Sequence, residues 1–162
     1  QCDALRSGDV NMVATSDGGH WVQMRRILPA FAGCELVFVG SEAALDADLG
    51  AALGTGSGAA RYYPVRNVSR ANAHELPLLL WQLARAVRRE RPDAVVTTGA
   101  GLLALGMGKI LARSRTVWID SVANTERMSM SGRMARHVAD AWLVQWEHLA
   151  RPEGPHYWGA VL

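Results

Sequence analysis

Short apolar runs alternate with helix-like segments along this chain, and this alternation constrains its fold more than any other feature. The apolar runs predict six strands, at residues 10–15, 36–40, 62–65, 94–98, 116–120 and 142–146. The segments between them predict helices at residues 21–31, 75–91, 102–112 and 133–139. Strands that alternate with helices pair in parallel through right-handed crossovers. The sequence therefore predicts an α/β fold, a Rossmann-like doubly wound parallel sheet covered by helices on both faces.

Size and charge are those of one ordinary soluble domain. The 162 residues are 49% apolar and 20% charged, which suffices for one hydrophobic core but not for two full domains. We expect one domain over residues 1–162, with a disordered N-terminus at residues 1–9. A net charge of only +2 does not favour nucleic acid as a partner. The longest uncharged stretch, residues 94–108, is shorter than a membrane-spanning helix of about 20 residues.

The first post-strand loop, SDGGH at residues 16–20, is the leading candidate for a ligand site. Ligands of doubly wound sheets bind beyond the carboxyl ends of the strands. Gly18 and Gly19 let the backbone approach a phosphate or diphosphate closely, and a helix N-terminus follows them. His20 could contact that phosphate or act as a base. The alternative is a tight turn that carries a surface histidine.

Several other functions have little support in the sequence. The fingerprint GxGxxG is absent after the first strand, which disfavours NAD. The run GTGSG at residues 54–58 lacks the Lys-Ser/Thr of a phosphate-binding loop, so we interpret residues 46–60 as a flexible loop. Two distant cysteines and the absence of HExxH argue against a metal site and favour a reducing cytosol. We expect no metal and no cofactor.

Two further segments each allow two interpretations. Asp120, Ser121, Asn124 and Glu126 follow a buried strand, where they could contact a sugar or merely cap helices and face water. The helix at residues 75–91 carries leucines on one side and arginines toward its end. It could lie on an anionic membrane, or it could cover the sheet with its arginines in water.

Four stretches of the chain resemble a known family. They are SDGGHWVQM, RPDAVVTTGAGLL, VWIDSVANTERMSMSGRMARHVADAWLVQWEHL and YWGAVL. Together they are similar to the oligosaccharide-biosynthesis family. This family contains the acceptor-side, membrane-recruiting subunit of the two-subunit N-acetylglucosaminyltransferase of asparagine-linked glycosylation, and bacterial exopolysaccharide counterparts. The similarity extends over residues 10–162, and its most specific elements are SxSG at residues 129–132 and QWE at residues 145–147.

The resemblance implies the N-terminal half of a GT-B glycosyltransferase that is divided between two polypeptides. This half would bind a lipid-linked saccharide acceptor, while a second small subunit would carry the UDP-sugar site. The activity would be that of a hexosyltransferase that needs both chains. We expect this chain in the cytoplasm, peripherally attached to the inner face of the cytoplasmic membrane.

By the same resemblance, particular residues are assigned roles. His20 would be the catalytic base or a diphosphate contact. The acceptor would bind at Gly18, Gly19, His20, Asp120, Ser121 and Asn124. The partner subunit would contact Gln145, Trp146, Glu147, Tyr157 and Trp158. The membrane would contact Leu79, Leu80, Arg85, Arg88 and Arg89.

Two rival functions remain open at this point. The chain could be a non-catalytic scaffold that recruits a catalytic partner to the membrane, or a self-contained module that binds nucleotide sugars. A scaffold would tolerate replacement of His20 and Asp120, and a nucleotide-sugar module would bind UDP-sugars by itself.

Overall fold

The computed structural model describes residues 8–16, 18–41, 60–68, 70–99 and 101–161. Seven strands form one sheet in the order β3-β2-β1-β4-β5-β6-β7, and every neighbouring pair is parallel. The strands are β1 (Val10–Ala14), β2 (Glu35–Gly40), β3 (Ala60–Pro64), β4 (Ala94–Thr98), β5 (Arg115–Ile119), β6 (Ala141–Val144) and β7 (His156–Tyr157). The prediction of a Rossmann-like doubly wound sheet is confirmed.

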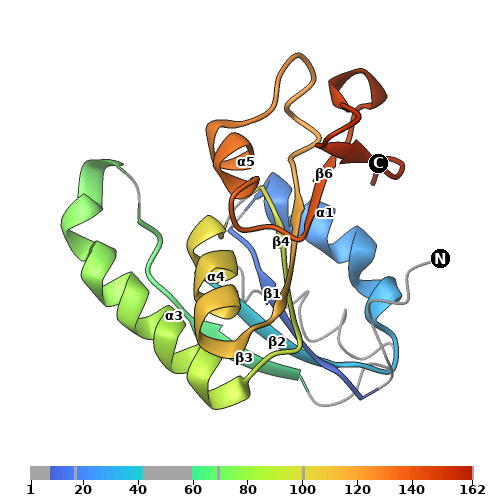
Figure 1. Ribbon diagram of the computed structural model, residues 1–162. Coiled ribbons are helices and arrows are strands. Elements are labelled where there is room, and N and C mark those ends of the chain that lie inside the picture. Colours follow the sequence, from blue (N-terminus) through green and yellow to red (C-terminus); the bar gives the residue numbers. More distant parts are fainter. Residues whose placement is uncertain (1–7, 17, 42–59, 69, 100, 162) are drawn as a thin grey trace.

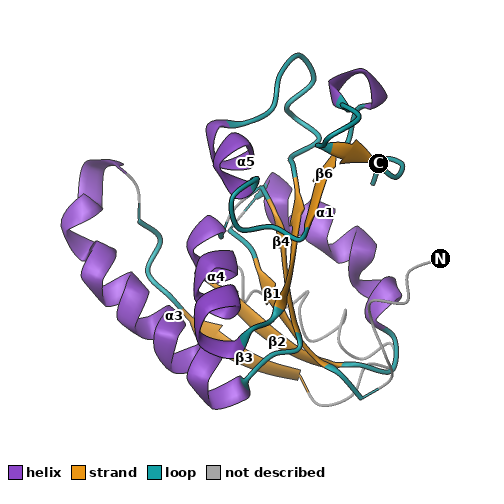
Figure 2. Ribbon diagram, in the orientation of Figure 1, coloured by secondary structure: helices purple, strands orange, loops and turns teal. Residues whose placement is uncertain are grey.

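Helices cover both faces of this sheet (Figures 1 and 2). One face is covered by α1 (Gly19–Ile27) and the 3-10 turn η1 (Leu28–Phe31). The other face carries α3 (Leu76–Glu90), α4 (Leu102–Met107) with its π-helical extension η4 (Gly108–Ala112), and α5 (Met130–Ala135). Two further 3-10 segments are η3 (Arg70–Glu75) and η5 (Glu147–Leu149). None of the helices that the structure describes combines the length and apolar character needed to cross a lipid bilayer.

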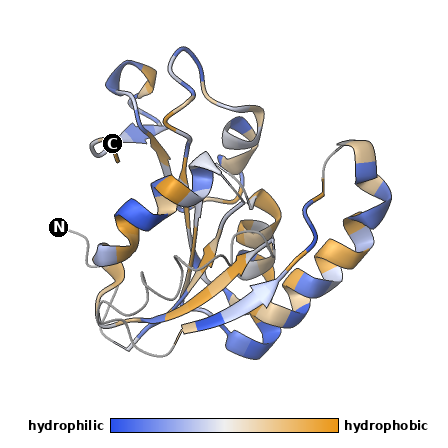
Figure 3. Cartoon of the chain, turned by 180° about the vertical axis from the view of Figure 1, so that it is seen from behind, coloured by the Kyte–Doolittle hydropathy of each residue, from blue (hydrophilic) through white to orange (hydrophobic). Residues whose placement is uncertain are grey.

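The hydrophobic core has two layers because successive side chains of a strand point to opposite faces of the sheet. Met12 and Val95 pack toward α3 and α4, whereas Val13 and Val96 pack toward α1. Figure 3 shows β2 as largely hydrophobic and the edge strand β3 as more hydrophilic, while α3 carries both hydrophobic and hydrophilic residues. Burial on both faces explains why the predicted strands are continuous apolar runs rather than alternating ones.

Several element boundaries differ from those predicted. The helix expected at residues 133–139 is wrong at both ends, because α5 begins at Met130 and ends at Ala135. Ser129 caps this helix, since its Oγ accepts a hydrogen bond of 2.8 Å from the Gly132 N–H. The short edge strand β7 was not predicted. The expected flexible loop lies almost wholly outside the described residues, except that Ala60 begins β3, and the expected disordered N-terminus lies mostly outside them.

Candidate functional site

A cavity of about 450 Å³ lies at the carboxyl edge of the sheet. Its walls include the ends of β1 and β2, the segment after β3, and the starts of the loop and helix that follow β4. Polar groups come from Thr15, Ser16, Arg66, Asn67 and Ser131, and apolar surface from Leu79, Leu83 and Leu102. This is the edge at which doubly wound sheets bind ligands.

His20 lies next to this cavity, in the first turn of α1. Its backbone oxygen accepts a hydrogen bond of 2.9 Å from the Thr98 hydroxyl, which ties the start of α1 to the end of β4. A Cβ on Gly99 would meet the Cε1 atom of His20 and would lie 2.7 Å from its Nδ1. Because Gly99 also lines the cavity, the cavity and the imidazole meet at this glycine. His20, after β1, and Gly99, after β4, are distant in sequence but thus meet at one site.

The imidazole of His20 is half-buried, and its Nδ1 is a buried atom with no hydrogen-bond partner among the described residues. Burial lowers the pKa of His20 below its ordinary value, and the nearby Asp120 carboxylate and the backbone of Thr98 oppose this only in part. The histidine is therefore neutral at pH 7, the form required to accept a proton.

The lowered pKa of His20 predicts a pH-dependent stability. The unfolded chain binds a proton at His20 more readily than the folded chain, so protonation favours unfolding. We expect the melting temperature of the wild type to fall more than that of His20→Gln as the pH drops below the unfolded pKa of about 6.5. Thermal unfolding of both proteins between neutral and mildly acidic pH measures the difference. Parallel curves for the two proteins would contradict the assignment.

Asp120 organises the loop that follows β5, and its side chain is only 1% exposed. Its Oδ1 accepts a hydrogen bond of 2.7 Å from the Ser129 hydroxyl. Its Oδ2 accepts one of 3.1 Å from the Ser129 N–H and one of 3.1 Å from the Asn124 amide. The carboxylate thus fixes residues 121–129 from inside. It acts on His20 through its charge, because no hydrogen bond joins the two side chains in the described structure.

The other predicted acceptor-binding residues differ in their surroundings. Gly18 has a φ of 72°, a conformation that favours glycine, and both Gly18 and Gly19 are exposed at the start of α1. Ser121 lies beside Gly99, since its Cβ would be 3.3 Å from a Cβ placed there. Asn124 donates its amide to Asp120. The structure brings Ser121 close to His20, whereas it gives Asp120 and Asn124 partners within the loop.

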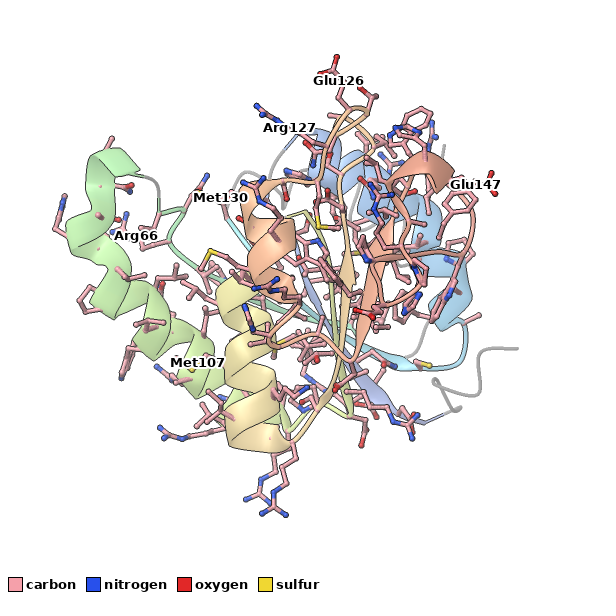
Figure 4. The ribbon with its side chains drawn as sticks, turned by 45° about the horizontal axis from the view of Figure 1, so that its top comes forward. Arg66, Met107, Glu126, Arg127, Met130 and Glu147 are labelled. Atoms are coloured by element: carbon pink, nitrogen blue, oxygen red, sulfur yellow. The ribbon has the colours of Figure 1, made fainter. Side chains whose placement is uncertain are left out.

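The predicted partner-interface residues also divide into two groups. Gln145 is buried and accepts a hydrogen bond of 2.7 Å from the Val161 N–H, which holds the C-terminal segment. The indole N–H of Trp146 donates to the Val122 oxygen over 2.9 Å. Glu147, Tyr157 and Trp158 are exposed, with Trp158 65% accessible. Figure 4 shows Glu147 projecting away from the sheet. Only the exposed three are free to meet another chain without rearrangement.

The predicted membrane residues lie on α3. Leu79 packs against the buried core and lines the cavity, so its side chain faces inward. Leu80 is half-buried, and Arg85, Arg88 and Arg89 are exposed. The guanidinium of Arg85 lies 5.6 Å from the centre of the Trp81 ring.

Two features of the site escaped sequence reasoning. Gly99 provides the space that the His20 ring occupies, and Arg66 brings a cation to the cavity. The loop at residues 99–101 follows a predicted strand and is one of the loops in which the sequence predicts a ligand site, but the sequence does not show that Gly99 makes room for the His20 ring. Arg66 had no signal in the sequence, because its place depends on where β3 pairs. Among the described residues, no group of three His, Cys, Asp or Glu side chains could hold a metal ion.

The fold and site define a Rossmann-like domain with a candidate ligand site at the carboxyl edge of its sheet. A similar fold occurs in a crystal structure of UDP-N-acetylglucosamine 2-epimerase, with a TM-score of 0.59 and 12% identity over 86% of this chain and 42% of that one. At this identity the likeness concerns the fold alone.

Sequence comparison identifies the family. Residues 77–161 match the family described as "Oligosaccharide biosynthesis protein Alg14 like", and the chain belongs to this family. The "UDP-N-acetylglucosamine transferase subunit ALG14" of Eremothecium gossypii is 36% identical over 124 residues, which are 68% of this chain and 50% of the fungal protein. The protein of the same name in Mus musculus is 31% identical over 81 residues, 43% of this chain and 36% of the mouse protein. The chain thus spans half or less of these relatives.

Proposed function

We propose that this chain is the acceptor-binding, membrane-associated subunit of a bipartite GT-B glycosyltransferase. It would work with a second subunit that carries the UDP-sugar site, at the cytoplasmic face of the membrane. The pair would transfer a sugar from a UDP-sugar to a saccharide linked to a lipid diphosphate. The relatives support the division into two chains, because they are named as subunits of a transferase.

The observation that carries this proposal is the meeting of His20 with the cavity at Gly99. Glycosyl transfer requires a group that removes the proton from the attacking hydroxyl. A half-buried imidazole whose pKa is lowered can do so at neutral pH. Among the described residues that line the cavity, Arg66 is the only basic one, a cation suited to the acceptor's diphosphate. The site therefore offers a base beside Gly99 and an anion contact on the wall of the same cavity.

The chemistry assigned to this chain is half of the reaction. An acceptor hydroxyl held in the cavity gives its proton to His20, and its oxygen attacks the anomeric carbon of the donor sugar with inversion. The bond from the anomeric carbon to the UDP oxygen breaks, and UDP leaves with the electron pair. Stabilising that leaving group is assigned to the partner subunit.

Transfer by the isolated chain, by the partner and by the reconstituted pair tests this division. We expect transfer of labelled sugar only from the pair, since the UDP-sugar site lies on the other polypeptide. Calorimetry with UDP-sugars on the isolated chain should detect no binding. Turnover by the isolated chain would overturn the proposal. Full activity of the pair after replacement of His20 would instead favour the non-catalytic scaffold.

A further inference from the structure

An apolar groove of about 340 Å³ lies on the helical face between α3, α4 with η4, and α5. It shares only Leu102 and Leu103 with the described lining of the cavity next to His20. Its walls are formed mainly by Leu80, Leu103, Met107, Ile110, Met134 and Val138. In Figure 4, Met107 lies between α4 and α3, and Met130 projects from the start of α5. No described segment of the chain fills this groove.

Exposed apolar side chains concentrate on the helices that form the groove. Ten large hydrophobic residues are exposed among the described ones, and seven of them lie on the helices that form the groove: Leu76, Leu78, Trp81, Leu103, Ile110, Met130 and Met134. Ile110 is 77% exposed, although it belongs to the same π-helical segment as the buried Gly108. Scattered exposed leucines are common in soluble proteins, but a contiguous apolar patch indicates an interaction surface.

The charges on these helices are almost all positive. Arg85, Arg88 and Arg89 lie on α3, Lys109 on η4 and Arg133 on α5. The only carboxylate on the same helices is Glu90, which is 7% exposed and bound to Arg61 over 2.7 Å. Lys109 is paired with Asp140 over 2.5 Å, whereas among the described residues neither Arg88 nor Arg133 forms an ion pair. Exposed apolar side chains and unpaired arginines on the same helices complement a surface that is both anionic and apolar.

We propose that this helical face, centred on Ile110 and Met134, docks onto an anionic lipid bilayer. Apolar side chains would enter the headgroup region while the arginines contact lipid phosphates. Trp81 fits this arrangement, because tryptophan favours the membrane interface. The inference rests on the proposed function, in which the chain acts at a membrane. It also moves the centre of membrane contact from α3, where the sequence places it, to the groove shared with α4 and α5.

The groove lies next to the candidate acceptor site. Leu102 and Leu103 line both the groove and the cavity next to His20. A bilayer on the groove therefore lies directly beside the mouth of the candidate acceptor site. A lipid-linked acceptor could keep its tail in the bilayer while its saccharide reaches the cavity.

Vesicle co-sedimentation of the full chain tests the surface without any transfer reaction. We expect binding to vesicles of phosphatidylcholine mixed with phosphatidylglycerol, and much weaker binding to phosphatidylcholine alone. Replacing both Ile110 and Met134 by serine should weaken binding about tenfold or more. Arg85→Gln and Arg88→Gln should each weaken binding about fivefold, and high salt should also weaken binding of the wild type. Val22→Ser, at an exposed apolar residue of α1 on the opposite face, is the matched control and should bind as the wild type.

Three outcomes overturn the inference. The first is wild-type binding to neither kind of vesicle, and the second is undiminished binding by the Ile110→Ser, Met134→Ser variant. The third is a dimer in sedimentation velocity that the same variant converts to a monomer, because this face would then join two copies of the chain.

A second measurement separates this inference from the proposed function: sugar transfer by the reconstituted pair to an acceptor with a short, water-soluble lipid. A pair that contains the Ile110→Ser, Met134→Ser variant should transfer sugar to this acceptor at the wild-type rate. Failure of the wild-type pair on this acceptor would contradict the proposed function but not the membrane-docking inference.

Discussion

Replacing Gly99 by alanine is expected to lower sugar transfer by the reconstituted pair about a hundredfold, the contribution of a general base. The added methyl group would clash with the His20 ring, with Nδ1 only 2.7 Å away and Cε1 closer still. The ring cannot stay in place, so the base leaves the edge of the cavity. His20→Ala should cause a similar loss, because both changes remove the same group. Initial rates at saturating donor and acceptor measure the effect.

Gly8→Ala is the matched control for Gly99→Ala. Both glycines have positive φ, 93° for Gly8 and 70° for Gly99, so an alanine at either costs about 1–2 kcal/mol of backbone strain. A Cβ on Gly8 meets nothing within 4 Å. We therefore expect similar losses of stability but full activity for Gly8→Ala. Equal transfer rates for the two variants would remove His20 from the mechanism.

The second large effect is expected at Asp120. Asp120→Ala removes the acceptor of three hydrogen bonds and leaves the Ser129 N–H, the Ser129 hydroxyl and the Asn124 amide without this partner. Losing a buried acceptor of this kind costs about 3 kcal/mol. For a chain of this size, that loss corresponds to a fall of roughly 6–12 °C in the melting temperature. Differential scanning calorimetry measures both quantities.

Asp120→Asn should lie between the wild type and the alanine variant. The asparagine oxygen still accepts one or two of the hydrogen bonds, but its NH₂ group cannot replace the second carboxylate oxygen. Glu153→Ala removes an exposed carboxylate and should leave the melting temperature unchanged. If Asp120→Ala were as stable as Glu153→Ala, the loop at residues 121–129 would not depend on this carboxylate.

The fold was largely predictable because both faces of the sheet are buried. Strands such as β2 and β4 are continuous apolar runs, and the helices between them require parallel pairing. The predictions failed where local sequence carries little hydrophobic signal. The start of α5 depends on one hydrogen bond of the Ser129 hydroxyl, and β7 has only two residues, both exposed. Short edge strands of this kind are defined by their neighbour rather than by their own residues.

The candidate site was predictable only in part. The SDGGH turn and its His20 follow from a strand, a glycine pair and a helix in succession, which local sequence records. The sequence does not record that Thr98 holds the backbone of His20, or that Gly99 makes room for its ring. Nor does it distinguish the buried carboxylate of Asp120 from an exposed one. These properties arise from contacts between residues far apart in the chain.

The sequence by itself determined the alternation of strands and helices, the parallel sheet and the edge at which a ligand should bind. It did so because periodicity and turn chemistry are local properties of the chain. The tertiary structure decided which loops meet at that edge, and therefore why His20 is neutral and next to a cavity. It also decided that Leu79 faces the core while Ile110 and Met134 face outward, because helix packing alone selects which apolar residues are covered.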